Sequence, residues 1–273
     1  GLVGSEMCIR DSICGGKINI TSTTDAIQAE TTLTIEKGEI NLKTGGGSEN
    51  SSKTSRGKDN PQWGRWGQED SSTTEEDTAS AKGLKAGGDI KISNATITAD
   101  TSDDSIHSNS NVTIESGTFN LKSGDDGIHA DTSTVINNGN IVIEKSYEGI
   151  EGSNVTINGG TIELTASDDG INSAGGSDSS SMGGRMGQNS FTENSDIYIK
   201  ITGGKVTVDA SGDGLDSNSN LIIEGGEIYV NGPTNDGNGA LDYDGTATIS
   251  GGTFVAVGSS GMVQGFSDSS TQC

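Results

Sequence analysis

The chain has 273 residues, of which only 29% are hydrophobic and 4% aromatic, too few for the core of a conventional large globular domain. Its formal net charge of −23 argues against nucleic acid and anionic membranes as partners. The charge favours cations or a neutral polymer, and it allows an acidic polymer only where metal ions bridge the two negative surfaces.

The chain opens with a segment that does not match the rest. Residues 1–12 (GLVGSEMCIRDS) resemble translated adaptor sequence, and we expect a non-native leader there. Residues 13–273 would then form a single domain, as a fragment whose native ends are missing. The three cysteines lie near the two ends and predict no disulfide framework. No apolar run is long enough to insert into a membrane.

A short acidic phrase returns about every 22 residues. It reads DDSI, DDGI, YEGI and DDGI, and its last residues are Ile106, Ile128, Ile150 and Ile171. With that apolar residue as the origin of each repeat, further apolar residues follow at +6, +8, +13 and +15. Such a period indicates stacked identical units. The full set of origins is Ile27, Leu84, Ile106, Ile128, Ile150, Ile171, Leu215, Leu241 and Met262.

Apolar residues two positions apart, with polar residues between them, are typical of strands. Each repeat therefore predicts three short strands, around the origin, at +6/+8 and at +13/+15, with Gly and Asn in the turns. Three strands in about 22 residues predict an all-β fold, a parallel β-helix of about nine coils. A thin core suffices because each coil buries its inner face against its neighbours.

Two intervals between origins are too long for one repeat, at 57 and 44 residues. They predict loop insertions at 45–79 and 174–195. The first insertion contains Trp63, Arg65 and Trp66. Sugar rings stack on aromatic side chains and Arg pairs with carboxylates, so these three are candidate polysaccharide contacts. Packing of the loop against the solenoid is the alternative.

Stacked coils lie about 4.8 Å apart, so acidic residues at equal repeat positions form columns. Carboxylates this close repel one another unless they are protonated or share a cation. Ca2+ accepts about six to eight oxygen ligands with tolerant geometry, whereas Mg2+ demands a tighter octahedron and Zn2+ prefers His or Cys. The columns therefore predict Ca2+ as cofactor. The candidate ligands are Asp126, Glu148, Glu151, Asp168, Asp169, Asp213, Asp216 and Asp242.

Two other interpretations concern the same columns. Asp in a turn often only hydrogen-bonds the local backbone, although several acidic pairs in register favour the cation. His107 and His129 also stack, and we expect a solvent-exposed or hydrogen-bonded ladder there rather than a metal or catalytic site.

The DDGI coils, the Gly-Gly-Thr turns at 159–161 and 251–253, and the segments 238–243 (NGALDY) and 260–262 (SGM) resemble a known family. It is a family of secreted bacterial carbohydrate-binding-domain proteins from cellulose-degrading clostridia, and the resemblance covers about residues 15–272. It implies a right-handed, polysaccharide-lyase-like parallel β-helix that binds Ca2+ and plant cell-wall polysaccharide, such as cellulose or polygalacturonate, without demonstrated catalysis. It also implies a secreted or cell-surface location, and we expect a monomer.

Two alternative functions stay open. The Asp-Asp-Gly-x-Asp calcium motif of family 9 pectate lyases is similar, but here residues 168–172 end in Asn172 and residues 213–216 lack the first Asp. A Ca2+-dependent lyase would also need a Lys or Arg base. The nearest lysines, in no distinctive motif, are Lys122, Lys145, Lys200 and Lys205. A structural or adhesive surface solenoid is the other alternative, and we assign no catalytic residue.

Overall fold

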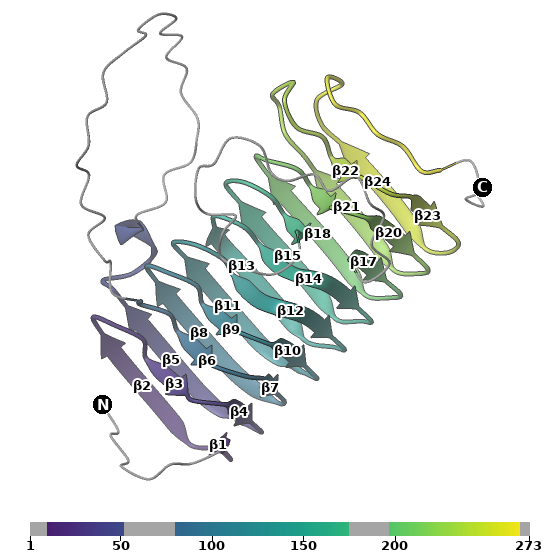
Figure 1. Cartoon of the computed structure of the whole chain (residues 1–273). Helices are drawn as coiled ribbons and strands as arrows, with labels where there is room; N and C mark the ends of the chain where they lie inside the picture. The colour runs from purple at the N-terminus through teal and green to yellow at the C-terminus, as the bar shows by residue number, and fades with distance from the viewer. Residues whose placement is uncertain (1–9, 52–79, 175–196, 268–273) are drawn as a thin grey trace, which may run out of the picture.

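The computed structural model describes residues 10–51, 80–174 and 197–267, which form a parallel β-solenoid of about nine coils (Figure 1). All of its strand pairs are parallel, and equal repeat positions pair between coils, as Ile106 does with Ile128 and Ile128 with Ile150. The helical content of these ranges is one 3₁₀ turn, η1 (Ser48–Asn50). The predicted fold is therefore confirmed.

Three stacks of strands run along the solenoid. The first stack, which holds the origins, contains β3 (Ile27–Ala29), β6 (Leu84–Ala86), β9 (Ile106–Ser108), β12 (Ile128–Ile136), β14 (Ile150–Ile157), β16 (Ile171–Ser173), β19 (Leu215–Ser217) and β22 (Leu241–Tyr243). The second adds to the later parts of β12 and β14 the strands β1 (Arg10–Ile13), β4 (Thr32–Ile35), β7 (Ile90–Ile92), β10 (Asn111–Ile114), β17 (Tyr198–Ile201), β20 (Asn220–Ile223) and β23 (Ala247–Ile249). The third contains β2 (Lys17–Ser22), β5 (Gly38–Thr44), β8 (Ala95–Thr101), β11 (Gly117–Ser123), β13 (Asn140–Ser146), β15 (Thr161–Ala166), β18 (Lys205–Ala210), β21 (Glu227–Asn231) and β24 (Thr253–Val257).

The first two stacks are joined into one sheet. Strands β12 and β14 run without a break from the first stack into the second, so these stacks form a 15-stranded sheet beside the 9-stranded third stack. The three predicted strands of a repeat are thus fused into two in these coils.

The core consists of apolar columns, one for each inward-facing repeat position. Val112, Ile114, Phe119 and Leu121, at +6, +8, +13 and +15 from Ile106, are all fully buried. Thr134 replaces an apolar residue at +6 in the next coil, and its hydroxyl donates to the Glu151 carbonyl oxygen at 2.8 Å. That hydrogen bond compensates for the burial of a polar group.

The insertions leave the stacking intact. Ile27 pairs with Leu84 across the first insertion, and Ile171 pairs with Leu215 across the second. Residues 52–79 and 175–196, including Trp63, Arg65 and Trp66, lie outside the described residues. The described root of the first insertion is held by the solenoid, because the Ser48 N–H donates to Asp100 at 2.8 Å.

At each end of the solenoid, the structure bears on a prediction made from the sequence: the leader at the N-terminal end and the last origin at the C-terminal end. The expected leader, 1–12, overlaps β1, whose residues pair with β4. The prediction that Met262 is a further repeat origin is wrong, because Met262 lies in a turn rather than in a strand of the first stack and is 47% exposed. The apolar origins end at Leu241 because no strand of the first stack follows β22 in the described chain.

Glycine is required where the second stack turns into the third. Gly139 and Gly160 have φ values of 136° and 91°, a region that L side chains rarely adopt. A Cβ on Gly160 would lie 2.6 Å from the Gly139 carbonyl oxygen in the coil before. The turns therefore stack as closely as the strands do.

We expect Phe119→Ala to lower the free energy of unfolding by about 3–5 kcal/mol, because it removes the largest fully buried side chain among the described residues and leaves a cavity between coils. The matched control is Thr118→Ala on the exposed face of the same strand, with a change within about 0.5 kcal/mol. Urea unfolding followed by circular dichroism measures both. Equal stabilities of the two variants would contradict the assigned core.

Candidate functional site

Two columns of polar side chains lie together along the first stack. The turn column holds the residues two positions before each origin: Asp25, Lys82, Asp104, Asp126, Glu148, Asp169, Asp213 and Gly239. The strand column holds the residues one position after each origin: Gln28, Lys85, His107, His129, Glu151, Asn172, Asp216 and Asp242.

Carboxylates of the turn column bind the backbone of the next coil. An oxygen of Asp104 accepts the Asp126 N–H at 3.0 Å, one of Asp169 accepts the Asp213 N–H at 2.6 Å, and one of Asp213 accepts the Gly239 N–H at 2.5 Å. Local hydrogen bonding, the alternative to metal binding, is therefore present. Each of these carboxylates still has a second oxygen for another partner.

Asp104 lies between a lysine and a histidine. Its carboxylate is fully buried, 2.5 Å from Lys82 Nζ and 2.8 Å from His107 Nδ1. Burial by itself would raise the pKa of Asp104, but the Lys82 ammonium and the His107 ring hold that pKa well below its usual range. Lys82 also reaches Asp103 at 3.1 Å, so one buried ammonium serves two carboxylates.

His129 is enclosed by three carboxylates. Its Nδ1 lies 2.6 Å from Glu151 and 3.1 Å from Asp126, and its Nε2 lies 3.1 Å from Asp131. Burial would lower the pKa of His129, but the hydrogen bonds to Asp126 and Glu151 raise that pKa to about 12. Both ring nitrogens face acceptors, so the ring is an imidazolium, the internal cation of these coils.

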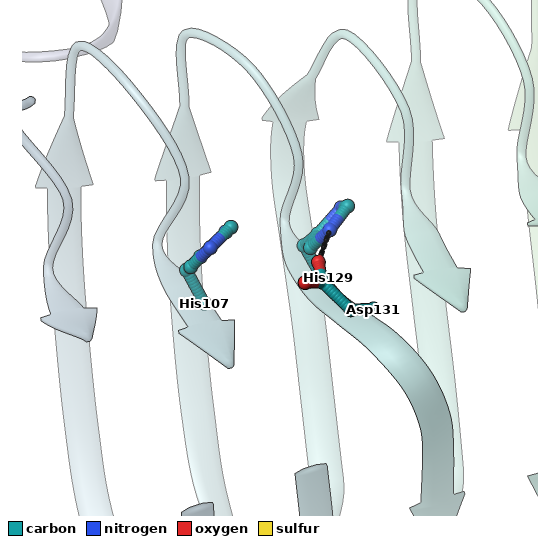
Figure 2. A group of neighbouring side chains, drawn as sticks. All are labelled: His107, His129 and Asp131. Carbon is teal, nitrogen blue, oxygen red and sulfur yellow. Dashed lines mark hydrogen bonds and ion pairs between the residues drawn. The ribbon is translucent and has the colours of Figure 1, made fainter. Parts of the chain in front are cut away.

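The rings of His107 and His129 stack on successive coils, with centroids 4.7 Å apart and planes 8° from parallel (Figure 2). The expected ladder is thus a buried, hydrogen-bonded one. His107, His129 and Asp131 bring possible ligand atoms within 4.8 Å of one another. Two parallel rings cannot aim their lone pairs at one ion, and the Nε2 atoms already meet Asn109 and Asp131. This group therefore does not fit Zn2+.

The acidic residues beyond Glu151 have different surroundings. Carboxylate oxygens of Asp169, Asp213 and Asp216 lie within 4.8 Å of one another. No ion pair found in the described ranges reaches any of these three residues. Burial, followed by the charges of Asp216 and Glu148, raises the pKa of Asp169 well above its usual value. Burial and neighbouring carboxylates likewise raise the pKa of Asp213 to about 6 and that of Asp216 to about 8.

Asn172 adds a neutral oxygen to this region. Its side chain is 4% exposed, and its Nδ2 donates to Glu148 at 3.0 Å. Its Oδ1 is buried and has no hydrogen-bond partner among the residues that the structure describes, a costly situation for a polar atom. Asn172 pairs in register with Asp216 on the next coil. In the sequence Asn172 is a departure from a lyase motif, and its repeat position also places it in the strand column between Glu151 and Asp216.

The structure divides the eight predicted metal ligands into separate groups. Asp169, Asp213 and Asp216 form one cluster, whereas Asp126 and Glu151 belong to the His129 group. The remaining ligands have other surroundings: Glu148 accepts from Asn172, Asp168 is partly buried beside Asp169, and Asp242 accepts from Gln264 Nε2 at 2.7 Å. The predicted sugar contacts Trp63, Arg65 and Trp66 fall outside the described ranges.

A family model described as "carbohydrate-binding domain-containing protein" matches residues 11–127 and 110–193, which together exceed half of the chain. The chain belongs to this carbohydrate-binding domain family. The two matched segments overlap at 110–127, as expected when a repeated sequence aligns in more than one register. No curated protein and no solved structure matches the chain.

In this carbohydrate-binding domain protein, the lysines expected near the acidic columns have other partners. Lys122 pairs with Glu144 at 2.9 Å, Lys145 with Glu49 at 2.8 Å, and Lys200 with Glu224 at 3.0 Å. Lys205 lies over the Tyr229 ring. None of these contacts involves the Asp169 cluster. The described part of the chain also contains no helix with the length and apolar character needed to cross a bilayer.

We expect the metal-free protein to lose stability as the pH rises from about 5 to about 9. The folded pKa values of Asp213 and Asp216 lie above their unfolded value of 3.8, so the folded state binds more protons in this range. Their contribution is fully present below the unfolded pKa and is lost as pH rises through about 6 and about 8. Asp216→Asn should flatten the decline above neutral pH. Urea unfolding in the presence of a chelator measures both, and a wild-type stability that rises over this range would contradict the raised pKa values.

Proposed function

We propose that this protein binds plant cell-wall polysaccharide of the cellulose or polygalacturonate type, without catalysis, and that Ca2+ bound by Asp169, Asp213 and Asp216 takes part. Membership of the carbohydrate-binding domain family supports the polysaccharide. The carboxylate cluster with no counter-ion among the described residues supports the cation.

The ligand chemistry fits Ca2+ better than the other common ions. The three carboxylates, the unpartnered Oδ1 of Asn172, and water would supply oxygen ligands only. Zn2+ would require nitrogen or sulfur ligands, which this cluster lacks among the described residues. The ion would neutralise carboxylates whose repulsion otherwise favours their protonation. Glu148 and Asp242, which flank the cluster, would contribute to the negative potential.

A partly exposed Ca2+ would give this protein a way to bind an acidic sugar despite its own negative charge. Open coordination positions of the ion would accept a uronate carboxylate, so that one cation bridges two negative groups. Trp63 and Trp66 would stack on sugar rings, and Arg65 would pair with uronate carboxylates. We propose a secreted or cell-surface protein that acts as a monomer. The extracellular location fits a partly exposed Ca2+ cluster, because the Ca2+ sites of extracellular modules bind with a Kd of about 10⁻⁴–10⁻³ M.

We expect isothermal calorimetry on metal-stripped protein to show heat of Ca2+ binding. Asp216→Asn should weaken that binding about tenfold or more, because it removes a charged oxygen ligand from the cluster. Asp209→Asn, on the exposed face of β18, is the matched control and should bind as the wild type does. The absence of heat at millimolar CaCl2, or an unchanged affinity of the Asp216 variant, would refute the site.

Polysaccharide binding is tested by retention on insoluble cellulose and on pectate gel. We expect retention on at least one polymer, and retention on pectate should fall when EDTA removes the bridging ion. Trp66→Ala should lower retention without changing Ca2+ binding, since sugar stacking on an aromatic ring is lost. Retention no greater than that of an inert protein of similar charge would rule out the proposed function.

A further inference from the structure

Among the described residues, the cations of the chain that contact the two polar columns all lie in one half of these columns. Lys82 contacts Asp104 at 2.5 Å, Lys85 contacts Asp25 at 3.1 Å, and His129 contacts Glu151 at 2.6 Å. These contacts involve the coils of β3, β6, β9 and β12, and the His129 contact extends to β14. This first half of the columns thus contains counter-ions supplied by the chain, while burial and the charges of Asp125 and Asp104 still raise the pKa of Asp126.

The second half, in the coils of β16, β19 and β22, is built differently. The strand column there holds Asn172, Asp216 and Asp242, and the turn column holds Asp169 and Asp213. No Lys, Arg or His from the described residues pairs with this set. The buried Oδ1 of Asn172 accepts no hydrogen bond from the described residues and belongs to the residue paired with Asp216, so it is open to a cation or to a hydrogen-bond donor.

We propose that the two halves are neutralised by different cations: ammonium and imidazolium groups of the chain in the first half, and a divalent metal held by Asp169, Asp213, Asp216 and Asn172 Oδ1 in the second. This inference rests on the proposed Ca2+ binding and adds where the ion acts. Asp126 and Glu151 then hydrogen-bond the His129 ring and do not coordinate a metal. Metal removal loosens the coils of β16, β19 and β22 and leaves those of β6 and β9 unchanged.

The localised effect follows from the architecture. In a solenoid each coil contacts only its neighbours, so stability is close to a sum of local terms. Removing a counter-ion from the second half raises repulsion between carboxylates of adjacent coils there. The first half keeps its buried ion pairs, so the free energy of local opening there does not depend on whether a metal is bound.

Hydrogen–deuterium exchange on the whole chain tests this division. With Ca2+ at about 100 times its Kd, amides of β16, β19 and β22 should exchange up to about 100-fold more slowly than in metal-stripped protein. Amides of β6 and β9 should exchange at the same rate in both samples. Equal changes in both halves, or no change in the second half, would overturn the proposal.

Calorimetry on the same samples separates the two ideas. If Ca2+ binds but protection does not follow the division, the inference fails and the proposed function stands. If no Ca2+ binds, the proposed metal site fails with it. Exchange of the wild-type protein therefore decides the question without any variant.

A substitution tests the role of the internal cation. Oxygens of Asp103, Asp104 and Asp125 lie within 4.8 Å of one another, and the Lys82 ammonium binds two of these residues. Lys82→Met removes that ammonium at similar length, so this variant should bind one additional Ca2+ per chain, and β6 and β9 should become Ca2+-dependent in exchange. Lys91→Met removes an exposed partner of Glu115 and should change neither. An unchanged stoichiometry in folded Lys82→Met would overturn the proposal.

Discussion

The constraint on which the structure depends is the register between coils. Parallel hydrogen bonding places equal repeat positions directly over one another at about 4.8 Å, so a residue type repeated along the chain becomes a column in space. Apolar columns such as Ile106, Ile128 and Ile150 gain from this, because each side chain packs against its copies. Carboxylate columns are penalised by the same geometry, since charges that could avoid one another in a looser fold are held together.

Three features of the structure reduce the repulsion between these carboxylates. Carboxylates such as Asp169 and Asp213 accept backbone N–H groups of the next coil, which stabilises their charge and ties the coils together. Lys82 and His129 place buried positive charge among the carboxylates of the earlier coils. In the later coils, where no described Lys, Arg or His pairs with these carboxylates, burial and mutual repulsion raise the pKa values of Asp169 and Asp216, so protonation reduces the charge there. Burial and the charges of Asp125 and Asp104 also raise the pKa of Asp126 in the earlier coils, although Asp126 contacts His129. The same columns thus contain positively charged side chains in the earlier coils and, among the described residues, only acidic and neutral side chains in the later coils. We expect the binding function in the later coils, where the described chain supplies no counter-ion.

The two insertions fit the same architecture. Strand pairs Ile27–Leu84 and Ile171–Leu215 keep their register although many residues intervene, because a loop can leave the turn of one coil without disturbing the strands above and below. The solenoid therefore tolerates insertions between its coils, such as the one whose sequence contains Trp63, Arg65 and Trp66. Such a division between scaffold and loop is common in binding proteins. It also allows a chain with few hydrophobic residues to present a large surface.

The sequence by itself determined the period, the parallel β-solenoid, the three strands of each coil, the origins from Ile27 to Leu241 and the columns, because backbone spacing and apolar alternation are local properties. It did not predict that β12 and β14 would run through a corner, or that Met262 would be exposed, since both depend on contacts beyond one repeat. It also could not separate Asp126 and Glu151 from Asp169, because partners are set by side-chain directions. Only the tertiary structure decided that Asp126 and Glu151 hydrogen-bond His129, and that the Oδ1 of Asn172 accepts no hydrogen bond among the described residues, since both depend on the directions of side chains from different coils.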